Sequence, residues 1–272
     1  MPELPEVENA RLSLQSLGFV GQTLTQIELR RKGLRVPFPS GLAKRLKGQT
    51  FLAVHRRAKY LLFETEDFFL LSHLGMTGSW RTLSSAPRKK HDHIVLHFSN
   101  GLEVAYNDPR RFGLLDLVRK KELAENRWLK HLGVEPLAAE FDSAYLFSLS
   151  RKMKGSIKAF LMDQKRVVGV GNIYASEVLF AAAMKPTRAA GRISKIDAEK
   201  LVVNIRRILG SAIAAGGSTI RDYRNSRGEA GSFQDQHLVY DRAGEPCRVC
   251  TTRIRSQPIA GRSTFWCPQC QR

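Results

Sequence analysis

The sequence has no cysteine before residue 247 and no long apolar run. Its four cysteines all lie between residues 247 and 272, which argues against a disulfide framework dispersed through a secreted fold. No apolar stretch reaches the ~20 residues that a membrane-spanning helix needs, and no basic stretch is followed by a signal-type apolar core. We therefore expect a cytoplasmic protein without a membrane partner.

Acidic residues are also scarce. The chain has 25 Asp and Glu against 44 Lys and Arg, which gives a net charge of +19 and a pI near 10.2. This excess predicts a polyanionic partner, most simply nucleic acid, with an anionic membrane surface as the competing choice. A hydrophobic content of 43% over 272 residues supports real cores in one large or two ordinary domains.

Residue patterns predict an α+β chain with two main parts. Val7, Ala10 and Leu14 recur on one helical face, and strand-like runs follow, including a hairpin of residues 93–98 and 102–106 turned by Asn100-Gly101. After about Pro136 the period becomes helical, with helices expected at 143–152, 156–163, 173–183 and 194–215, capped by Ser143, Ser156 and the pair Ser194 and Asp197. Residues 217–237 are polar and Gly-rich, as in a mobile loop. The predicted domains are 1–136, 137–240 and 241–272.

The first residues after the initiator carry unusual chemistry. Trimming of Met1 would leave Pro2 as a free secondary amine, which attacks a sugar aldehyde carbon and forms an iminium ion. Alpha-amino groups titrate near ~7.7–8.0, so part of this amine is unprotonated at neutral pH. Glu3 beside it can donate or accept a proton. A disordered terminus is the alternative interpretation.

The spacing Cys247-x2-Cys250-x16-Cys267-x2-Cys270 predicts one structural zinc ion. Each pair places two thiolates on one tight turn, and four protein ligands leave no coordination position for water. Two disulfides or free thiols are the alternative. Beta-prone residues between the pairs predict a hairpin ribbon, in which Arg262 could face a phosphate.

Other segments combine basic, aromatic and glycine residues. Asp108-Pro109-Arg110-Arg111-Phe112-Gly113 suits a wedge that enters a base stack, or a surface turn with Phe112 tucked inward. In the loop His73-Leu74-Gly75-Met76-Thr77-Gly78, Met76 could fill space at a binding surface, although a core Met is commoner. Residues 56–60 and 88–91 are basic clusters that could meet phosphates. The Gly-rich turn at 167–172 leads into the helix expected at 173–183, and backbone amides at such a helix N-terminus bind phosphate well.

Together these segments resemble the formamidopyrimidine-DNA glycosylase family of bifunctional glycosylases and abasic-site lyases. The resemblance covers the whole chain: PELPEVE, RRAKYLL, HLGMTG, KHDH, DPRRFG, VVGVGNIYASE and the cysteine ribbon, in the family's order. It implies an N-terminal β-sandwich with a leading helix, a helical domain with a helix-two-turn-helix motif, and a zinc ribbon. The implied substrate is double-stranded DNA with oxidised bases or abasic sites, bound by a monomer.

The resemblance also implies residue roles. Pro2 would be the Schiff-base nucleophile, and Glu3 the proton donor for base loss and ring opening. Lys59 would act in β-elimination and Arg262 in δ-elimination. Phosphates around the lesion would be held by Lys59, His73, Asn172 and Arg262, and His91 would contact DNA. Met76, Arg110 and Phe112 would fill the gap left by the flipped nucleotide, and Arg111 in the same motif would bind DNA. Residues 217–237 would close over the flipped base.

The chain departs from the family before the Ser156-Ile157-Lys158 segment. Family members often carry an unbroken basic run there, whereas this chain has Arg151-Lys152-Met153-Lys154. Arg151, Lys152 and Lys154 are therefore all candidates for the DNA contact. A sister class that removes oxidised pyrimidines (the endonuclease VIII type) often begins Pro-Glu-Gly, and Leu4 here favours the purine branch. A non-enzymatic zinc-ribbon DNA-binding protein would explain the charge and the cysteines, but not Pro2, Glu3 and Lys59.

Overall fold

The structure is a computed structural model that describes residues 2–84, 87–219 and 225–272. The chain divides into two compact units, Met1–Lys130 with Ala215–Ser232, and His131–Ala214 with Phe233–Arg272. The expected division into a strand-rich part and a helical part is therefore present, and the described residues of 215–232 group with the strands. No helix in the described ranges is long and apolar enough to cross a bilayer.

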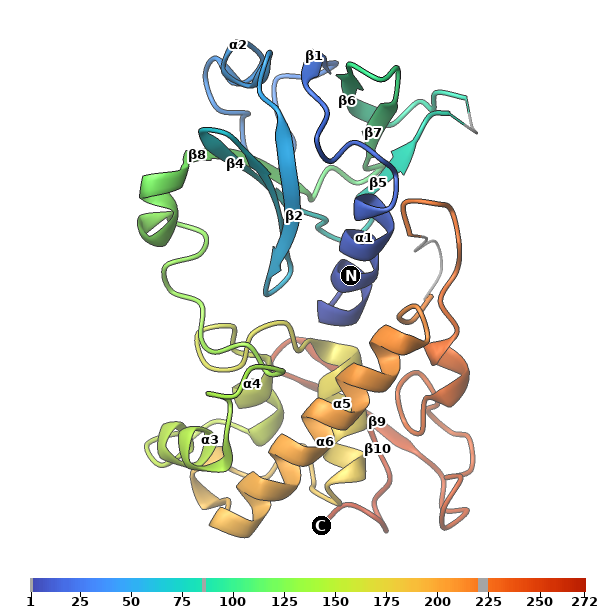
Figure 1. The fold of residues 1–272 in the computed structure, drawn as a ribbon. Helices are drawn as coiled ribbons and strands as arrows, with labels where there is room; N and C mark the ends of the chain where they lie inside the picture. Colours follow the sequence, from blue (N-terminus) through green and yellow to red (C-terminus); the bar gives the residue numbers. More distant parts are fainter. Residues whose placement is uncertain (1, 85–86, 220–224) are drawn as a thin grey trace. The chain divides into compact units, whose positions relative to one another are not determined.

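The first unit is a β-sandwich with a leading helix (Figure 1). Helix α1 (Leu4–Gln15) precedes two four-stranded antiparallel sheets. One sheet has the order β1 (Leu24–Leu29), β6 (Asp92–Phe98), β7 (Glu103–Asn107), β5 (Ser79–Thr82). The other has the order β2 (Phe51–Arg57), β3 (Tyr60–Thr65), β4 (Phe68–His73), β8 (Leu114–Arg119). The short helix α2 (Leu42–Leu46) connects β1 to β2, and the 3-10 helix η1 (Lys120–Glu125) follows β8, the last strand of these sheets. The predicted hairpin is β6 and β7, joined at Asn100-Gly101.

Aromatic side chains from both sheets form one core. Phe63 of β3 packs on Trp80 of β5 with ring centroids 5.1 Å apart, and Trp80 lies 5.1 Å from Tyr106 of β7. The Trp80 indole donates to Ser72 Oγ at 2.9 Å, so this buried polar group is satisfied. Because the inner faces of the two sheets share this core, the unit is a sandwich, as the resemblance implied.

Helix α1 is fixed by its own sequence. Pro5 lies in the first turn, where a missing N–H costs nothing. Glu3 is the N-cap, and Glu3 and Glu6 form a capping box. Val7, Ala10 and Leu14 are buried, as their spacing predicted.

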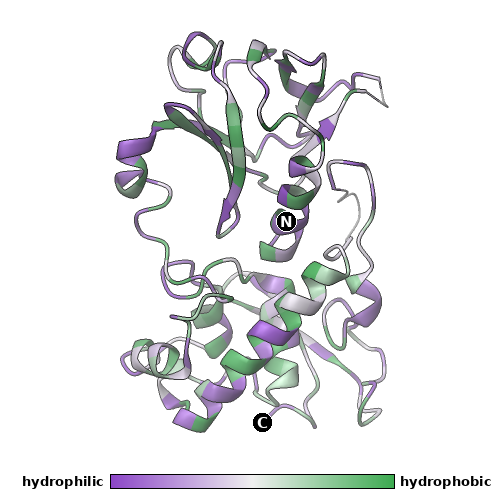
Figure 2. Ribbon diagram, viewed as in Figure 1, coloured by the Kyte–Doolittle hydropathy of each residue, from purple (hydrophilic) through white to green (hydrophobic). Residues whose placement is uncertain are grey.

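The second unit holds four α-helices and a strand hairpin within its described residues. They are α3 (Ser143–Ser150), α4 (Ile157–Met162), α5 (Asn172–Ala181), α6 (Lys195–Ala214), the 3-10 turns η2 (Ala190–Arg192) and η3 (Phe233–Gln236), and the hairpin of β9 (Arg255–Ile259) and β10 (Arg262–Trp266). Figure 2 shows hydrophobic and hydrophilic residues interleaved along α6. Its buried members, such as Leu201, Ile205 and Ile208, fall at helical spacing.

The capping predictions are mostly confirmed. Ser156 Oγ accepts the Ala159 N–H at 3.2 Å, and Ser194 and Asp197 exchange the two bonds of a capping box, at 3.1 and 2.8 Å. The prediction for Ser143 is wrong by one residue, because Asp142 precedes it and its carboxylate accepts the Tyr145 N–H at 2.7 Å. An Asp is as good an N-cap as a Ser, so adjacent candidates compete.

Candidate active site and DNA-contacting loops

The N-terminus is held in place by Glu6. Pro2 is buried at the head of α1, and Glu3 is 2% exposed. One carboxylate oxygen of Glu6 accepts the Glu3 N–H at 2.8 Å, and the other accepts the Ser218 N–H at 2.7 Å. Glu6 thus joins the start of the chain to the segment that follows α6. This arrangement is ordered rather than frayed, which contradicts the interpretation as a disordered start.

Hydrogen bonds join the two ends of the segment that is predicted to close over a flipped base. Ser232 N–H donates to Ala215 O at 2.9 Å, and Gly231 N–H donates to Thr219 Oγ1 at 2.8 Å. A Cβ on Gly231 would lie 2.1 Å from the carbonyl oxygen of Gly217, so the two ends require glycine to approach so closely. Of the predicted loop 217–237, residues 220–224 lie outside the described residues.

Lys59 lies in the two-residue turn between β2 and β3. Arg57 pairs with Tyr60 across this turn, and Ala58 has φ +53°, a left-handed conformation that is costly for a residue with a Cβ. Arg56 holds the turn, because it donates to Ala58 O at 3.0 Å and to the Glu8 carboxylate at 2.8 Å. Lys59 is 6% exposed, so its position is set by the hairpin.

His73 ends β4 as a neutral ring. Burial, with smaller contributions from the positive charges of Arg35 and Lys59, lowers the pKa of His73 to about 3. Its Nδ1 accepts the Gly75 N–H at 3.0 Å, which leaves Nε2 as the protonated nitrogen. His73 can therefore donate a hydrogen bond to a phosphate but supplies no positive charge at neutral pH.

Met76, Arg110 and Phe112 project from two adjacent loops of the first unit. Met76 is 37% exposed and Phe112 is 44% exposed, so neither the core Met nor the inward Phe is found. The Arg110 guanidinium lies over the Phe112 ring at 4.8 Å, a cation–π contact. Arg111 is exposed, with φ +57°. We call Met76, Arg110 and Phe112 the wedge residues.

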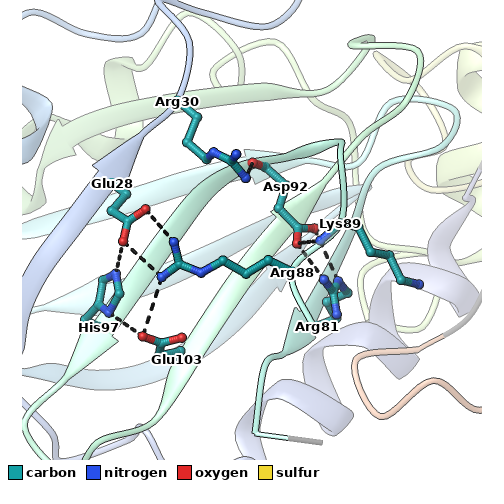
Figure 3. A network of polar contacts seen from close by, with 8 residues as sticks. All are labelled: Glu28, Arg30, Arg81, Arg88, Lys89, Asp92, His97 and Glu103. Carbon is teal, nitrogen blue, oxygen red and sulfur yellow. Dashed lines mark hydrogen bonds and ion pairs between the residues drawn. The ribbon is translucent and has the colours of Figure 1, made fainter. Parts of the chain in front are cut away.

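His91 follows a basic segment that is fastened to the sheet (Figure 3). The Asp92 side chain is buried and accepts hydrogen bonds from Arg81 at 2.5 Å and the Lys89 N–H at 2.6 Å. Although burial opposes ionisation, these bonds lower the pKa of Asp92. Arg88 pairs with Glu28 at 3.0 Å. His91 is thus held at the end of an anchored strand.

Arg262 and Asn172 come together in the second unit. Arg262 opens β10 after the turn Ala260-Gly261, and its side chain is exposed. The next carbonyl, of Ser263, accepts Asn172 Nδ2 at 2.9 Å and Lys158 Nζ at 3.2 Å. The Asn172 amide group therefore braces the turn that presents Arg262.

The basic run at 151–154 separates into two kinds of residue. Arg151 stacks on Phe147 at 3.9 Å and donates to Ser150 Oγ at 2.8 Å. Lys152 and Lys154 are exposed, and neither has a hydrogen bond or ion pair in the described ranges. The two lysines are thus freer than Arg151 to meet a phosphate.

The four cysteines converge on one metal site. Their Sγ atoms all lie within 4.8 Å of one another, with Cys247–Cys270 at 3.9 Å and Cys250–Cys267 at 3.4 Å. A disulfide would need about 2.05 Å, whereas Zn–S bonds of ~2.3 Å in a tetrahedron separate sulfurs by ~3.8 Å. All four are free thiols, so the residues fit one structural zinc ion, as predicted.

Sequence reasoning missed the buried polar residues that support these loops. Asp108 is 0% exposed, Asp92 is 1% exposed and Lys158 is 0% exposed. Asp92 directly follows His91, Asp108 begins the motif that contains Arg110, and Lys158 lies in the Ser156-Ile157-Lys158 segment. A charged residue within such a motif was the available signal, but only the fold shows which side chains turn inward.

Comparisons with known proteins agree along the whole chain. The family model for the formamidopyrimidine-DNA glycosylase N-terminal domain matches residues 1–115, that for the H2TH domain of the same enzyme matches residues 132–224, and a zinc finger found in FPG and IleRS matches residues 244–272. Formamidopyrimidine-DNA glycosylases of Bdellovibrio bacteriovorus and Serratia proteamaculans are 48% and 47% identical, each with 100% of both chains covered.

Solved structures of the same family are similar to this chain over its full length. A Lactococcus lactis FPG mutant in complex with Fapy-dG-containing DNA superposes with a TM-score of 0.92 at 37% identity, with 100% of both chains covered. MutM (Fpg) from Thermus thermophilus gives a TM-score of 0.90 at 39% identity, over 99% of this chain and 98% of that one. With these matches over its full length, the chain belongs to the formamidopyrimidine-DNA glycosylase family.

Proposed function

We propose that the protein is a base-excision repair enzyme that removes oxidised purines from duplex DNA and cleaves the resulting abasic site. The main support for this proposal is the position of the N-terminus, where Pro2 and the N-cap residue Glu3 are buried at the start of α1. Support also comes from Lactococcus lactis relatives solved with DNA that contains Fapy-dG or an abasic site. The net charge of +19 suits such a polyanion.

The chemistry starts at the Pro2 nitrogen. In the proposed reaction this amine attacks C1′ of the damaged nucleotide, and the base leaves with a proton donated by Glu3. The C1′–O4′ bond then breaks with protonation of O4′, which opens the sugar ring and leaves an iminium ion between C1′ and the Pro2 nitrogen. The iminium ion acidifies C2′, so loss of that proton expels the 3′ phosphate in β-elimination. A second elimination expels the 5′ phosphate, with Lys59 and Arg262 assigned to the two steps.

Purine preference is tested by comparing excision rates on duplexes that carry different lesions. The reason to include a pyrimidine lesion is that a Lactococcus lactis Fpg has also been solved with DNA that contains an oxidised pyrimidine. Single-turnover excision should be compared on duplexes that carry 8-oxoguanine, a formamidopyrimidine or an oxidised pyrimidine. Faster excision of the pyrimidine lesion than of both purine lesions would favour the endonuclease VIII type of activity instead.

Glu3→Gln is expected to slow base excision more than strand cleavage. Loss of a positioned general acid costs typically about 10²–10⁴-fold in rate, whereas a preformed abasic aldehyde needs no base to leave. The measurement compares single-turnover rates on an 8-oxoguanine duplex and on an abasic duplex. Equal losses on both substrates would contradict the role of Glu3 as the donor to the base.

Replacing Lys152 is expected to change the salt dependence of DNA binding, whereas replacing His73 is not. Each neutralised phosphate contributes about 0.9 to the slope of log K against log salt. Lys152→Ala should lower this slope by about 1, whereas His73→Gln should leave it unchanged because the low pKa of His73 keeps the ring neutral at pH 7. A slope reduced by His73→Gln would show that the imidazole is protonated in the complex.

Phe112→Ala is expected to weaken binding to damaged DNA selectively. The wedge offsets unstacking, which costs about a few kcal/mol and arises only when a base is flipped, so lesion affinity should fall about 10-fold or more. Leu52→Ala is a matched control, because Leu52 is 43% exposed against 44% for Phe112. If Phe112→Ala lowers both affinities by one factor, the side chain is a general contact.

A further inference from the structure

A buried carboxylate joins the two loops that carry the wedge residues. Asp108 is 0% exposed at the start of the loop that contains Arg110 and Phe112. Its Oδ1 accepts the Thr77 hydroxyl at 2.6 Å, and its Oδ2 accepts the Gly113 N–H at 2.8 Å. The Asp108 side chain thus closes its own loop and binds the loop that contains Met76.

The Thr77 hydroxyl both donates and accepts a hydrogen bond. It donates to Asp108 Oδ1 and accepts the Arg110 N–H at 3.2 Å. A hydroxyl offers one donor and two acceptor positions, so this group can bridge the carboxylate and the backbone of a wedge residue. Valine has the same shape but can make neither bond.

The backbones of the two loops also pack closely against each other. Gly75 has φ +63°, and a Cβ there would lie 2.4 Å from the Phe112 carbonyl carbon. A Cβ on Gly113 would lie 1.9 Å from the Tyr106 hydroxyl, which itself donates to His73 O at 3.3 Å. Neither glycine leaves room for a side chain.

Hydrogen bonds of the Asp108 backbone connect these two loops to the segment that contains His91 and His93. The Asp108 N–H donates to His91 O at 3.0 Å, and Asp108 O accepts His93 Nε2 at 2.9 Å. Asp108 therefore contacts three segments that carry predicted DNA-contacting residues: 73–78, 91–93 and 110–113. All of these contacts lie within the first unit.

We propose that Asp108 and Thr77 are positioning residues that fix lesion selectivity by holding the wedge residues in one preorganised arrangement. Neither side chain needs to touch DNA. A wedge on separately moving loops would have to be ordered at the moment of base flipping, and that ordering would weaken binding to damaged DNA. Undamaged duplex, whose bases stay stacked, demands no such ordering. This inference rests on the proposed function.

The test measures lesion selectivity for Thr77→Val and for the conservative variant Thr77→Ser. Selectivity is the ratio of dissociation constants for an undamaged duplex and for the same duplex with a stable abasic-site analogue, at one salt concentration. Removing the bridging hydroxyl leaves Asp108 Oδ1 and the Arg110 N–H without this partner, so Thr77→Val should lower selectivity about tenfold. Thr77→Ser keeps the hydroxyl and should stay within about twofold of the parent.

A double-mutant cycle separates positioning from general structural damage. If Thr77 acts through the wedge, Thr77→Val should have little further effect on selectivity once Phe112→Ala has removed the ring. Asp108→Asn, which weakens the same bridge, should lower selectivity in the same direction. Undamaged-duplex affinity reports folding in every variant.

Two results would overturn the proposal. One is equal selectivity for Thr77→Val and the parent, and the other is an equal fall in both affinities. A parent protein that shows no lesion selectivity at all would instead contradict the proposed function.

Discussion

Blocking the Pro2 nitrogen is expected to abolish covalent trapping of the protein on damaged DNA. Borohydride reduces the iminium ion between the amine and C1′ to a stable bond, so trapping requires a free amine at that position. An N-terminal extension converts this amine into an amide, which cannot form an iminium ion. Pro2→Gly, which replaces the secondary amine with a primary one, should trap severely less than the parent.

A matched variant separates this effect from damage to the helix. Pro5 lies in the same first turn of α1 but carries no proposed chemistry, so Pro5→Ala should still trap. Noncovalent binding to the duplex should survive the N-terminal extension to a greater degree than trapping does. Full trapping by an extended chain would identify a lysine, such as Lys59, as the nucleophile.

Removing the metal is expected to abolish DNA binding while leaving the first unit folded. Cys247 and Cys267 are buried with Phe180 and Ile254 in one small cluster. The cysteines therefore form a large part of the small core that holds the ribbon. The binding energy of such a closed zinc site is folding energy, and Cys247→Ser should unfold the ribbon that carries Arg262. In the proposed reaction, zinc makes no contact with the reacting atoms.

Metal content and binding are measured on the same samples. The parent should contain one zinc ion per chain, and chelation should remove the ion and duplex affinity together. Gln269→Ala, an exposed change between two ligands, should retain both. A metal-free protein that binds and cleaves normally would rule out a structural zinc ion.

Periodic and local signals predicted most of the fold. The apolar face of α1, the Asn100-Gly101 hairpin, the Ser156 cap and the cysteine spacing each depend on neighbours within a few residues, and each is present. The two-sheet sandwich followed from the family resemblance, because strand order depends on pairings distant in sequence.

The supporting contacts could not be predicted in the same way. The bond from Thr77 to Asp108 joins residues 31 positions apart, and the bond from Ser218 to Glu6 joins residues 212 positions apart. Asp108 and Glu6 resemble solvated acids until the fold turns them inward. Whether Met76 and Phe112 are exposed likewise depends on tertiary packing. The sequence alone therefore could not decide between a buried and an exposed position for either side chain.

Mass mapping of the trapped adduct tests the central claim most directly. The parent protein is reduced with borohydride on an 8-oxoguanine duplex, digested with protease and nuclease, and analysed for the peptide that carries the sugar remnant. We expect a single adduct on the nitrogen of an N-terminal Pro2. An adduct on the Lys59 side chain, with Pro2 unmodified, would contradict it.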